Sequence, residues 1–203
     1  MDGRQHRFSS TEVTGISVKE NKREGQKLRV GLSCSRPEES VPVLEVGIEI
    51  WSYNEPIMLV RYTASNVSTK TIEDMKLWNF MDFDIGGASS YNDDFGSFET
   101  ATRTLHVWDN SPLHVLMDSR PGPRAWEIST PTRMKLDDSR GQLENNTQAG
   151  PMDIATGLQW NLGDMSPSKS HSVELVLASA VKLDEARALI PKAWELFTRT
   201  MGR

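Results

Sequence analysis

The alternation of apolar and polar residues at positions 43–51 constrains the fold more than any other feature of the sequence. The apolar side chains fall at every second position and therefore share one side of an extended chain: Leu44, Val46, Ile48 and Ile50. Because successive side chains of a β-strand point to opposite faces of its sheet, this pattern predicts a strand with one buried face. The sequence therefore predicts that at least this part of the chain pairs into a β-sheet.

Strand-like segments continue through most of the remaining chain. They lie at residues 57–64, 72–85, 102–108, 113–117, 125–129, 158–162 and 173–180, with weaker peripheral segments at 4–18 and 27–33. Short polar turns join the first segments, so we expect residues 43–51, 57–64 and 72–85 to form an antiparallel meander. The total length of 203 residues suits a single, mainly all-β domain.

One segment near the end of the sequence has helical periodicity. Its apolar residues form one stripe on a helix: Ala186, Leu189, Ile190, Ala193, Trp194 and Phe197. Such a stripe is typical of a helix that packs on other elements, and Pro191 is expected to kink or split that helix. We predict that residues 1–203 form one two-sheet antiparallel β-sandwich domain with a C-terminal helix at about residues 184–200.

The composition limits the compartment and the kinds of partner. The formal net charge is −5 and there is no long basic run, so we expect no nucleic-acid partner. The sequence contains no apolar run long enough to span a bilayer, and residues 1–7 lack the apolar region of a signal peptide. Its single cysteine, Cys34, fits a reducing compartment. These features predict a cytoplasmic protein that has no membrane partner.

The strongest candidate for a functional site is the acidic turn that follows the segment 72–85. Asp82 and Asp84 share one face of the predicted strand, and Asp93 and Asp94 follow a glycine turn. Carboxylates placed this close together repel each other unless water, a cation or a partner offsets their charge. Oxygen ligands that alternate before a glycine turn suit calcium, although the full EF-hand pattern is absent.

We therefore predict a metal site, with calcium as the ion, formed by Asp82, Asp84, Asp93 and Asp94. The alternative is a solvated acidic turn, or carboxylates that pair with Arg61 or Arg103. Asp82 and Asp84 also have the separation that a glycosidase requires of its two carboxylates. We assign no residue a catalytic role.

Two long loops and several aromatic residues are further candidates for ligand binding. The loops at residues 85–100 and 136–155 are both acidic, and they would form one acidic mouth if they lay at the same end of a sandwich. Trp51, Trp108 and Trp126 are candidate ligand-binding residues because an exposed indole can stack on a sugar ring, with core packing as the alternative. His106 and His114 flank a predicted hairpin and could face each other.

Several motifs together resemble the β-supersandwich domains that accompany glycoside hydrolases and occur in mutarotase-like proteins. The motifs are Ile50-Trp51-Ser52-Tyr53, Leu59-Val60-Arg61-Tyr62, Asn66-Val67-Ser68, Asp82-Phe83-Asp84-Ile85-Gly86-Gly87 and the run from Leu158 to Pro167. This resemblance implies a sandwich fold and carbohydrate handling. The catalytic histidines and acidic base of the mutarotases cannot be placed on His106, His114 or any acidic residue of this chain.

Taken together, the sequence predicts a non-catalytic β-sandwich binding or assembly module that meets a glycan or protein partner at its acidic loops. One alternative is a carbohydrate-active enzyme that uses the same paired carboxylates. Another is a structural subunit of a homo-oligomer, in which a sheet face or the helix forms the interface. A raised carboxylate pKa in a deep cleft would favour the enzyme, whereas a large exposed apolar patch would favour the oligomer.

Overall fold

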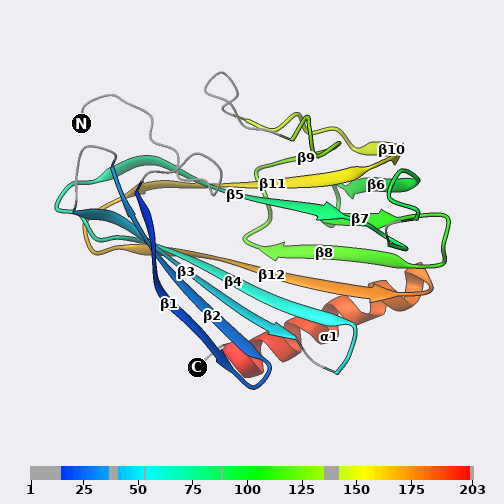
Figure 1. Ribbon diagram of the computed structural model, residues 1–203, viewed down its shortest axis with the longest axis horizontal. Coiled ribbons are helices and arrows are strands. Elements are labelled where there is room, and N and C mark those ends of the chain that lie inside the picture. The colour runs from blue at the N-terminus through cyan, green and yellow to red at the C-terminus, as the bar shows by residue number, and fades with distance from the viewer. Residues whose placement is uncertain (1–14, 37–40, 53, 88, 135–141, 202–203) are drawn as a thin grey trace. The chain divides into compact units, whose positions relative to one another are not determined.

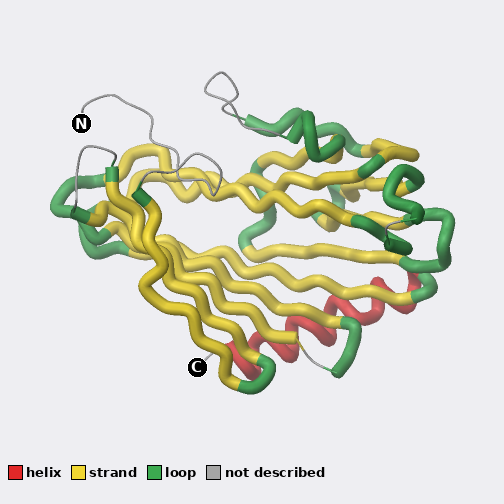
Figure 2. Tube along the Cα trace, viewed as in Figure 1, coloured by secondary structure: helices red, strands yellow, loops and turns green. Residues whose placement is uncertain are grey.

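The computed structural model describes residues 15–36, 41–52, 54–87, 89–134 and 142–201, which form two antiparallel sheets and one helix (Figures 1 and 2). The elements are β1 (Ile16–Glu24), β2 (Lys27–Ser35), β3 (Pro42–Ser52), β4 (Ile57–Asn66), β5 (Ile72–Phe83), β6 (Asp94–Glu99), β7 (Thr104–Trp108), β8 (His114–Arg120), β9 (Ala125–Ser129), β10 (Gln148–Met152), β11 (Ile154–Met165), β12 (Ser170–Ala180) and α1 (Leu183–Met201). The predicted two-sheet antiparallel sandwich with a C-terminal helix is confirmed. Most of the predicted segment 4–18 lies outside the described residues.

The strand order corrects one prediction about connectivity. The nine-stranded sheet has the order β1-β2-β3-β4-β12-β8-β7-β6-β10, and the three-stranded sheet has the order β5-β11-β9. The expected meander is therefore right for β3 and β4 and wrong for β5, which belongs to the other sheet. A short polar turn between two strands does not by itself decide whether the chain stays in one sheet or crosses to the next.

The chain divides into two compact units. The first unit comprises the described residues up to 51, together with 60–75 and 162–172, and the second comprises those at 52–59, 76–161 and 173–201. The predicted single domain stays a prediction. The described part of the chain contains no helix with the length and apolar character needed to cross a membrane.

Asn66 holds together the corner of the first unit, where β4 and β11 end. It is 1% exposed, and its Nδ2 donates to the carbonyl oxygens of Lys70 at 2.8 Å and Met165 at 2.7 Å. Its backbone N–H donates to the Lys169 carbonyl, and its own carbonyl accepts from the Ser168 N–H, both at 2.9 Å. A buried amide requires hydrogen-bond partners, and Asn66 meets this requirement by tying together the β4–β5 turn and the β11–β12 turn.

The helix α1 packs on β8 within the second unit, as its apolar stripe predicted. Its buried residues are Ala186, Ala193, Trp194, Leu196, Phe197 and Met201. The Trp194 indole N–H donates to Asp118 Oδ2 at 2.7 Å, and the Arg120 guanidinium lies 4.0 Å from the centre of a Trp194 ring. Pro191 lies inside the helix, which runs unbroken from Leu183 to Met201.

Two asparagines cover the outer edge of β9, the last strand of the three-stranded sheet. Asn145 exchanges hydrogen bonds with the backbone of Trp126, accepting through Oδ1 at 3.0 Å and donating through its backbone N–H at 2.7 Å. The side chain of Asn146 does the same for Ile128, accepting from its N–H at 2.9 Å and donating to its carbonyl at 2.8 Å. The asparagines thus satisfy backbone groups that a neighbouring strand would otherwise bond.

The substitution Asn146→Ala is expected to lower the free energy of unfolding by about 2 kcal/mol, because it leaves the buried N–H and C=O groups of Ile128 without partners. Urea unfolding of the variant and the wild type measures this loss. Gln142→Ala, which removes an exposed amide from the same loop, should have little effect. Equal losses in the two variants would contradict the role of Asn146.

Candidate functional site

Three carboxylates meet where β6 and β7 lie side by side in the second unit. In this antiparallel pair Phe95 lies opposite Trp108, so the next pair along the ladder brings Asp94 beside Asp109. Asp93 immediately precedes β6. One carboxylate oxygen from each aspartate lies within 4.8 Å of the others. We refer to Asp93, Asp94 and Asp109 as the acidic triad.

The glycine turn after β5 lies against this triad. Gly86 has a φ of 76°, in the left-handed region that glycine adopts readily, and a Cβ at this position would lie 2.5 Å from Asp109 Oδ2. The turn is closed by a hydrogen bond of 3.1 Å from the Gly87 N–H to the Asp84 carbonyl. Gly86 is therefore required both by the backbone conformation and by the approach of the Asp109 carboxylate.

The three carboxylates differ in their hydrogen bonds. Asp109 Oδ1 accepts from the Ser111 backbone N–H at 2.9 Å and from the Ser111 hydroxyl, and Asp93 Oδ2 accepts from Asn110 Nδ2 at 3.0 Å. Asp94 is 0% exposed, and neither of its carboxylate oxygens has a hydrogen-bond partner. Asp93 Oδ1 is also buried without a partner. Buried polar atoms without partners are costly, so these three oxygens require an explanation.

Electrostatics at the triad disfavour the ionised form of Asp94. Burial is the largest cause, and together with the neighbouring carboxylates of Asp109, Asp93 and Asp84 it raises the pKa of Asp94 to about 6. The backbone amide of Ile85 opposes this shift in the pKa, although its geometry falls short of a hydrogen bond. The site therefore favours any species that brings positive charge to the carboxylates, either a proton or a cation.

The structure brings together two of the four predicted metal ligands. Asp93 and Asp94 belong to the triad, whereas Asp84 is exposed and is close enough only to affect the pKa of Asp94. Asp82 is also exposed, and its pKa is raised by partial burial and by the carboxylates of Asp153 and Asp84. Asp109 was missed, although an antiparallel pairing of segments 94–99 and 104–108 would have placed it opposite Asp94.

The two arginines considered as partners of the acidic turn lie elsewhere. Arg61 is in the first unit, where its Nη1 lies 3.6 Å from Glu49 Oε2. Arg103 lines a cavity of the second unit, and no described carboxylate forms an ion pair with it. These contacts give no support to the expected pairing with the acidic turn.

The three predicted ligand-binding tryptophans pack against other side chains. Trp51 is 7% exposed and has the Lys27 ammonium group 4.3 Å from its ring centre. Trp126 stacks on Phe98 with ring centres 3.9 Å apart, and Trp108 stacks on Phe95 at 5.6 Å. Trp108 and Trp126 remain half-buried, so ligand binding by them stays a prediction.

A histidine pair lies next to Trp108 on β7 and β8. His106 Nε2 and His114 Nδ1 are 3.0 Å apart, as the predicted hairpin suggested, and the His106 ring stacks on Trp108 with centres 4.3 Å apart. Burial is the largest cause, and together with the positive charges of His114 and Arg187 it lowers the pKa of His106 to about 4. His106 is therefore uncharged at neutral pH.

Several solved structures are similar to this chain at low sequence identity. The GalM/aldose epimerase homologue from C. elegans is 8% identical with a TM-score of 0.53, and the match covers 81% of this chain and 68% of that chain. The heparan sulfate lyase HepC from Pedobacter heparinus is 8% identical with a TM-score of 0.46, and a polysaccharide lyase is 14% identical with a TM-score of 0.47.

The matches to the heparan sulfate lyase and to the polysaccharide lyase cover 81% and 88% of this chain, respectively. This chain spans only 21% and 24% of the length of those two lyases. No family model matches the sequence, and no curated protein matches it. The GalM/aldose epimerase homologue has a TM-score above 0.5, so the resemblance predicted from the sequence is confirmed at the level of the fold.

Proposed function

We propose that this protein is a non-catalytic binding module in which the acidic triad binds a calcium ion. The observation that carries this proposal is the carboxylate of Asp94, which is fully buried beside two other aspartates and has no hydrogen bond to either oxygen. A bound cation would replace the missing partners and offset the repulsion among the three charges.

Calcium is the ion that suits these donors best. It prefers hard oxygen ligands and takes 6 to 8 of them at flexible geometry. Asp93 Oδ1 and both oxygens of Asp94 are unpartnered, and Asp109 Oδ2 adjoins the Gly86 turn. Waters, backbone carbonyls or hydroxyl groups of a ligand would complete the coordination. The described residues of the triad offer no nitrogen or sulfur ligand, which disfavours zinc.

The burial of Asp94 also argues against acid catalysis by this site. A raised pKa can indicate a general acid, but a general acid must come within hydrogen-bond reach of its substrate. Asp94 is 0% exposed, so a saccharide could not reach it without a rearrangement of the loops. The raised pKa follows from burial and from the neighbouring carboxylates, and a cluster of this kind fits cation binding better than a catalytic role.

We propose a saccharide as the ligand class. Two features support this choice. The first is a fold that also occurs in carbohydrate-related proteins, although a fold alone does not determine function. The second is the presence of aromatic side chains near the triad. Tyr91 is 44% exposed and lies two residues before Asp93, where an aromatic ring can stack on a sugar. Calcium would order the acidic loops so that they present these groups.

Thermal and urea unfolding with calcium or with EDTA, at fixed ionic strength and pH 7.5, tests the metal site. Because an ion that binds only the native state stabilises it by mass action, calcium at ten times its Kd should add about 1.4 kcal/mol to the free energy of unfolding. EDTA should reverse this gain, and magnesium at the same concentration should give a smaller one.

The variant Asp94→Asn should lose the calcium response, whereas Glu195→Gln, which removes an exposed carboxylate from α1, should keep it. The proposal would be wrong if the wild type showed no calcium-specific gain, or if Asp94→Asn gained as much as the wild type. Comparison of the two variants separates an ion bound at the triad from general screening of the chain's negative charge.

A further inference from the structure

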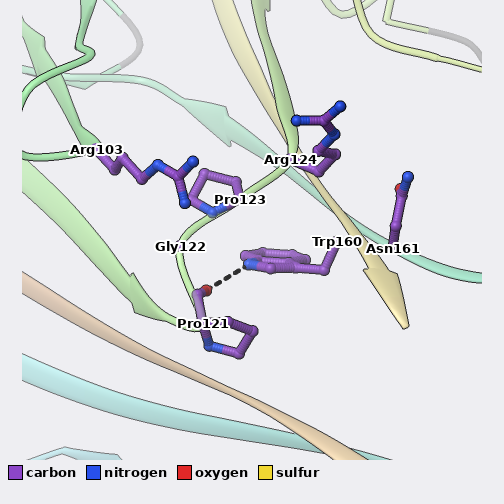
Figure 3. Close-up of a pocket in the computed structure, with 7 residues that line it drawn as sticks. All are labelled: Arg103, Pro121, Gly122, Pro123, Arg124, Trp160 and Asn161. Atoms are coloured by element: carbon purple, nitrogen blue, oxygen red, sulfur yellow. Dashed lines mark hydrogen bonds between the residues drawn. The ribbon is translucent and has the colours of Figure 1, made fainter. Parts of the chain in front are cut away.

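A small cavity in the second unit is distinct from the acidic triad. It has a volume of about 200 Å³ and is lined by Arg103, Pro121, Gly122, Pro123, Arg124, Trp160 and Asn161 (Figure 3). Arg103 comes from the β6–β7 turn, residues 121–124 connect β8 to β9, and the last two residues belong to β11. We refer to this cavity as the arginine cavity.

The wall of the arginine cavity is held by hydrogen bonds within the protein. The Trp160 indole N–H donates to the Pro121 carbonyl at 2.9 Å, the contact drawn in Figure 3, and the Ser119 hydroxyl donates to the same carbonyl at 3.0 Å. The Arg124 backbone N–H donates to the Gln159 carbonyl at 2.7 Å. Trp160 is 1% exposed, so its indole forms a fixed floor. A binding site requires such rigid support.

The charges that line this cavity are all positive. Arg103 and Arg124 are exposed, neither forms an ion pair with a described carboxylate, and the lining contains no acidic residue. Asn161 Oδ1 accepts from Gln159 Nε2 at 2.8 Å, which leaves the Asn161 amide nitrogen as a further donor. Two guanidinium groups and an amide with no local acid are unexpected in a chain whose formal net charge is −5.

Gly122 allows the Arg103 side chain to lie against the backbone of the cavity wall. A Cβ on Gly122 would lie 2.7 Å from Arg103 Cδ and 3.0 Å from Arg103 Nη1, and Figure 3 shows Arg103 reaching over Gly122 toward Pro123. Arg103 itself has a φ of 57°, in a region that non-glycine residues rarely adopt. Strained backbone of this kind persists where the surrounding structure fixes it, often at binding sites.

We propose that the arginine cavity binds the carboxylate or sulfate group of an acidic saccharide. Guanidinium groups form paired, charge-assisted hydrogen bonds with such oxyanions. A volume of about 200 Å³ admits one such group with part of one sugar ring, and the rest of the saccharide would lie outside. The oxyanion follows from the cavity itself, whereas the choice of a saccharide as its carrier rests on the proposed function.

The test is an NMR titration of the full chain at low ionic strength, with the indole N–H signal of Trp160 as the local reporter. Glucuronate should shift this signal in a saturable way, and glucose, which has the same ring without the carboxylate, should not. Arg103→Gln and Arg124→Gln should each weaken glucuronate binding about ten-fold, whereas Arg199→Gln, which removes an exposed arginine from α1, should not weaken it.

Gly122→Ala provides a second variant in which the net charge does not change. Its added methyl group should displace Arg103 and weaken glucuronate binding several-fold. Equal weakening by Arg199→Gln and by the cavity variants would overturn the proposal, because it would show attraction by general charge alone. No saturable shift with glucuronate or with inorganic sulfate would overturn it as well.

The experiments can refute the oxyanion site and the choice of a saccharide as its ligand independently of each other. Binding of acetate and inorganic sulfate as tightly as glucuronate would retain an oxyanion site but overturn the saccharide, the part that depends on the proposed function. Tighter binding of oligoglutamate than of a uronate oligosaccharide of equal charge would likewise overturn the saccharide. If the wild type showed no calcium response but still bound glucuronate, the metal site would be refuted and the oxyanion site would stand.

Discussion

Replacing Trp194 with alanine is expected to lower the free energy of unfolding by about 3–5 kcal/mol, the range for removing a large buried aromatic side chain. Trp194 is 6% exposed, lies under the Arg120 guanidinium and packs on Phe197 with ring centres 5.4 Å apart. The substitution leaves a cavity between α1 and β8 and removes the donor to Asp118 Oδ2. Urea unfolding monitored by circular dichroism measures the loss.

Trp194→Phe separates packing from hydrogen bonding at this position. It keeps most of the ring but removes the indole N–H, and Asp118 is only half-buried, so water can replace the lost donor. The expected cost is about 1 kcal/mol. If Trp194→Ala were no more destabilising than Trp194→Phe, packing of the indole would not hold α1 on β8, and the description of this helix as docked would need revision.

Acidification is expected to change the stability through two groups that act in opposite directions, each by up to about 3 kcal/mol. The pKa of Asp94 is raised in the folded state from 3.8 to about 6. Above pH 6 the folded state therefore contains a disfavoured charge, and this cost disappears as the pH falls from about 6 to 3.8. Asp94 thus makes the metal-free protein more stable in acid.

His106 has the reverse effect. Its pKa is lowered in the folded state from 6.5 to about 4. As the pH falls from 6.5 to about 4, the unfolded chain takes up a proton at this site while the folded protein resists it, so stability is lost. The pH ranges over which Asp94 and His106 titrate overlap, so their contributions to stability offset each other. The pH profile of the wild type therefore shows neither contribution separately.

Single variants should separate the two contributions in EDTA. Between pH 6.5 and 4, His106→Gln is expected to gain stability relative to the wild type, because only the Asp94 effect remains. Asp94→Asn is expected to be more stable than the wild type at pH 8 and to lose that advantage as the pH falls. Urea unfolding at a series of pH values measures both profiles. Parallel profiles for the wild type and both variants would refute the assigned shifts in pKa.

Sequence patterns predicted those elements whose buried face is apolar. The alternation in β3 and the helical stripe in α1 each place the apolar residues on one side of the element. Both elements were predicted within two residues of their bounds. β6 was taken for part of a loop, because its buried positions are Asp94, Gly96 and Phe98. An acid and a glycine on the inner face remove the apolar period on which strand prediction depends.

The same strand explains why the candidate site was predicted only in part. Asp93 and Asp94 stood out because they lie near Asp82 and Asp84 in the sequence, but the third carboxylate comes from pairing of β6 with β7. Asp109 is close in space only once that ladder forms. The arginine cavity was not predicted for a similar reason, since its residues come from three separate segments joined by the fold.

The corner held by Asn66 has a consequence for how this protein can be made. Asn66-Val67-Ser68 matches the acceptor sequence for N-linked glycosylation. A glycan would be joined to the same Nδ2 that donates to both Lys70 and Met165 inside the fold. Modification replaces one of these hydrogens and requires space that a residue 1% exposed does not have. Sugar attachment and the native corner therefore exclude each other, and a chain modified before it folds in a secretory host cannot complete this unit.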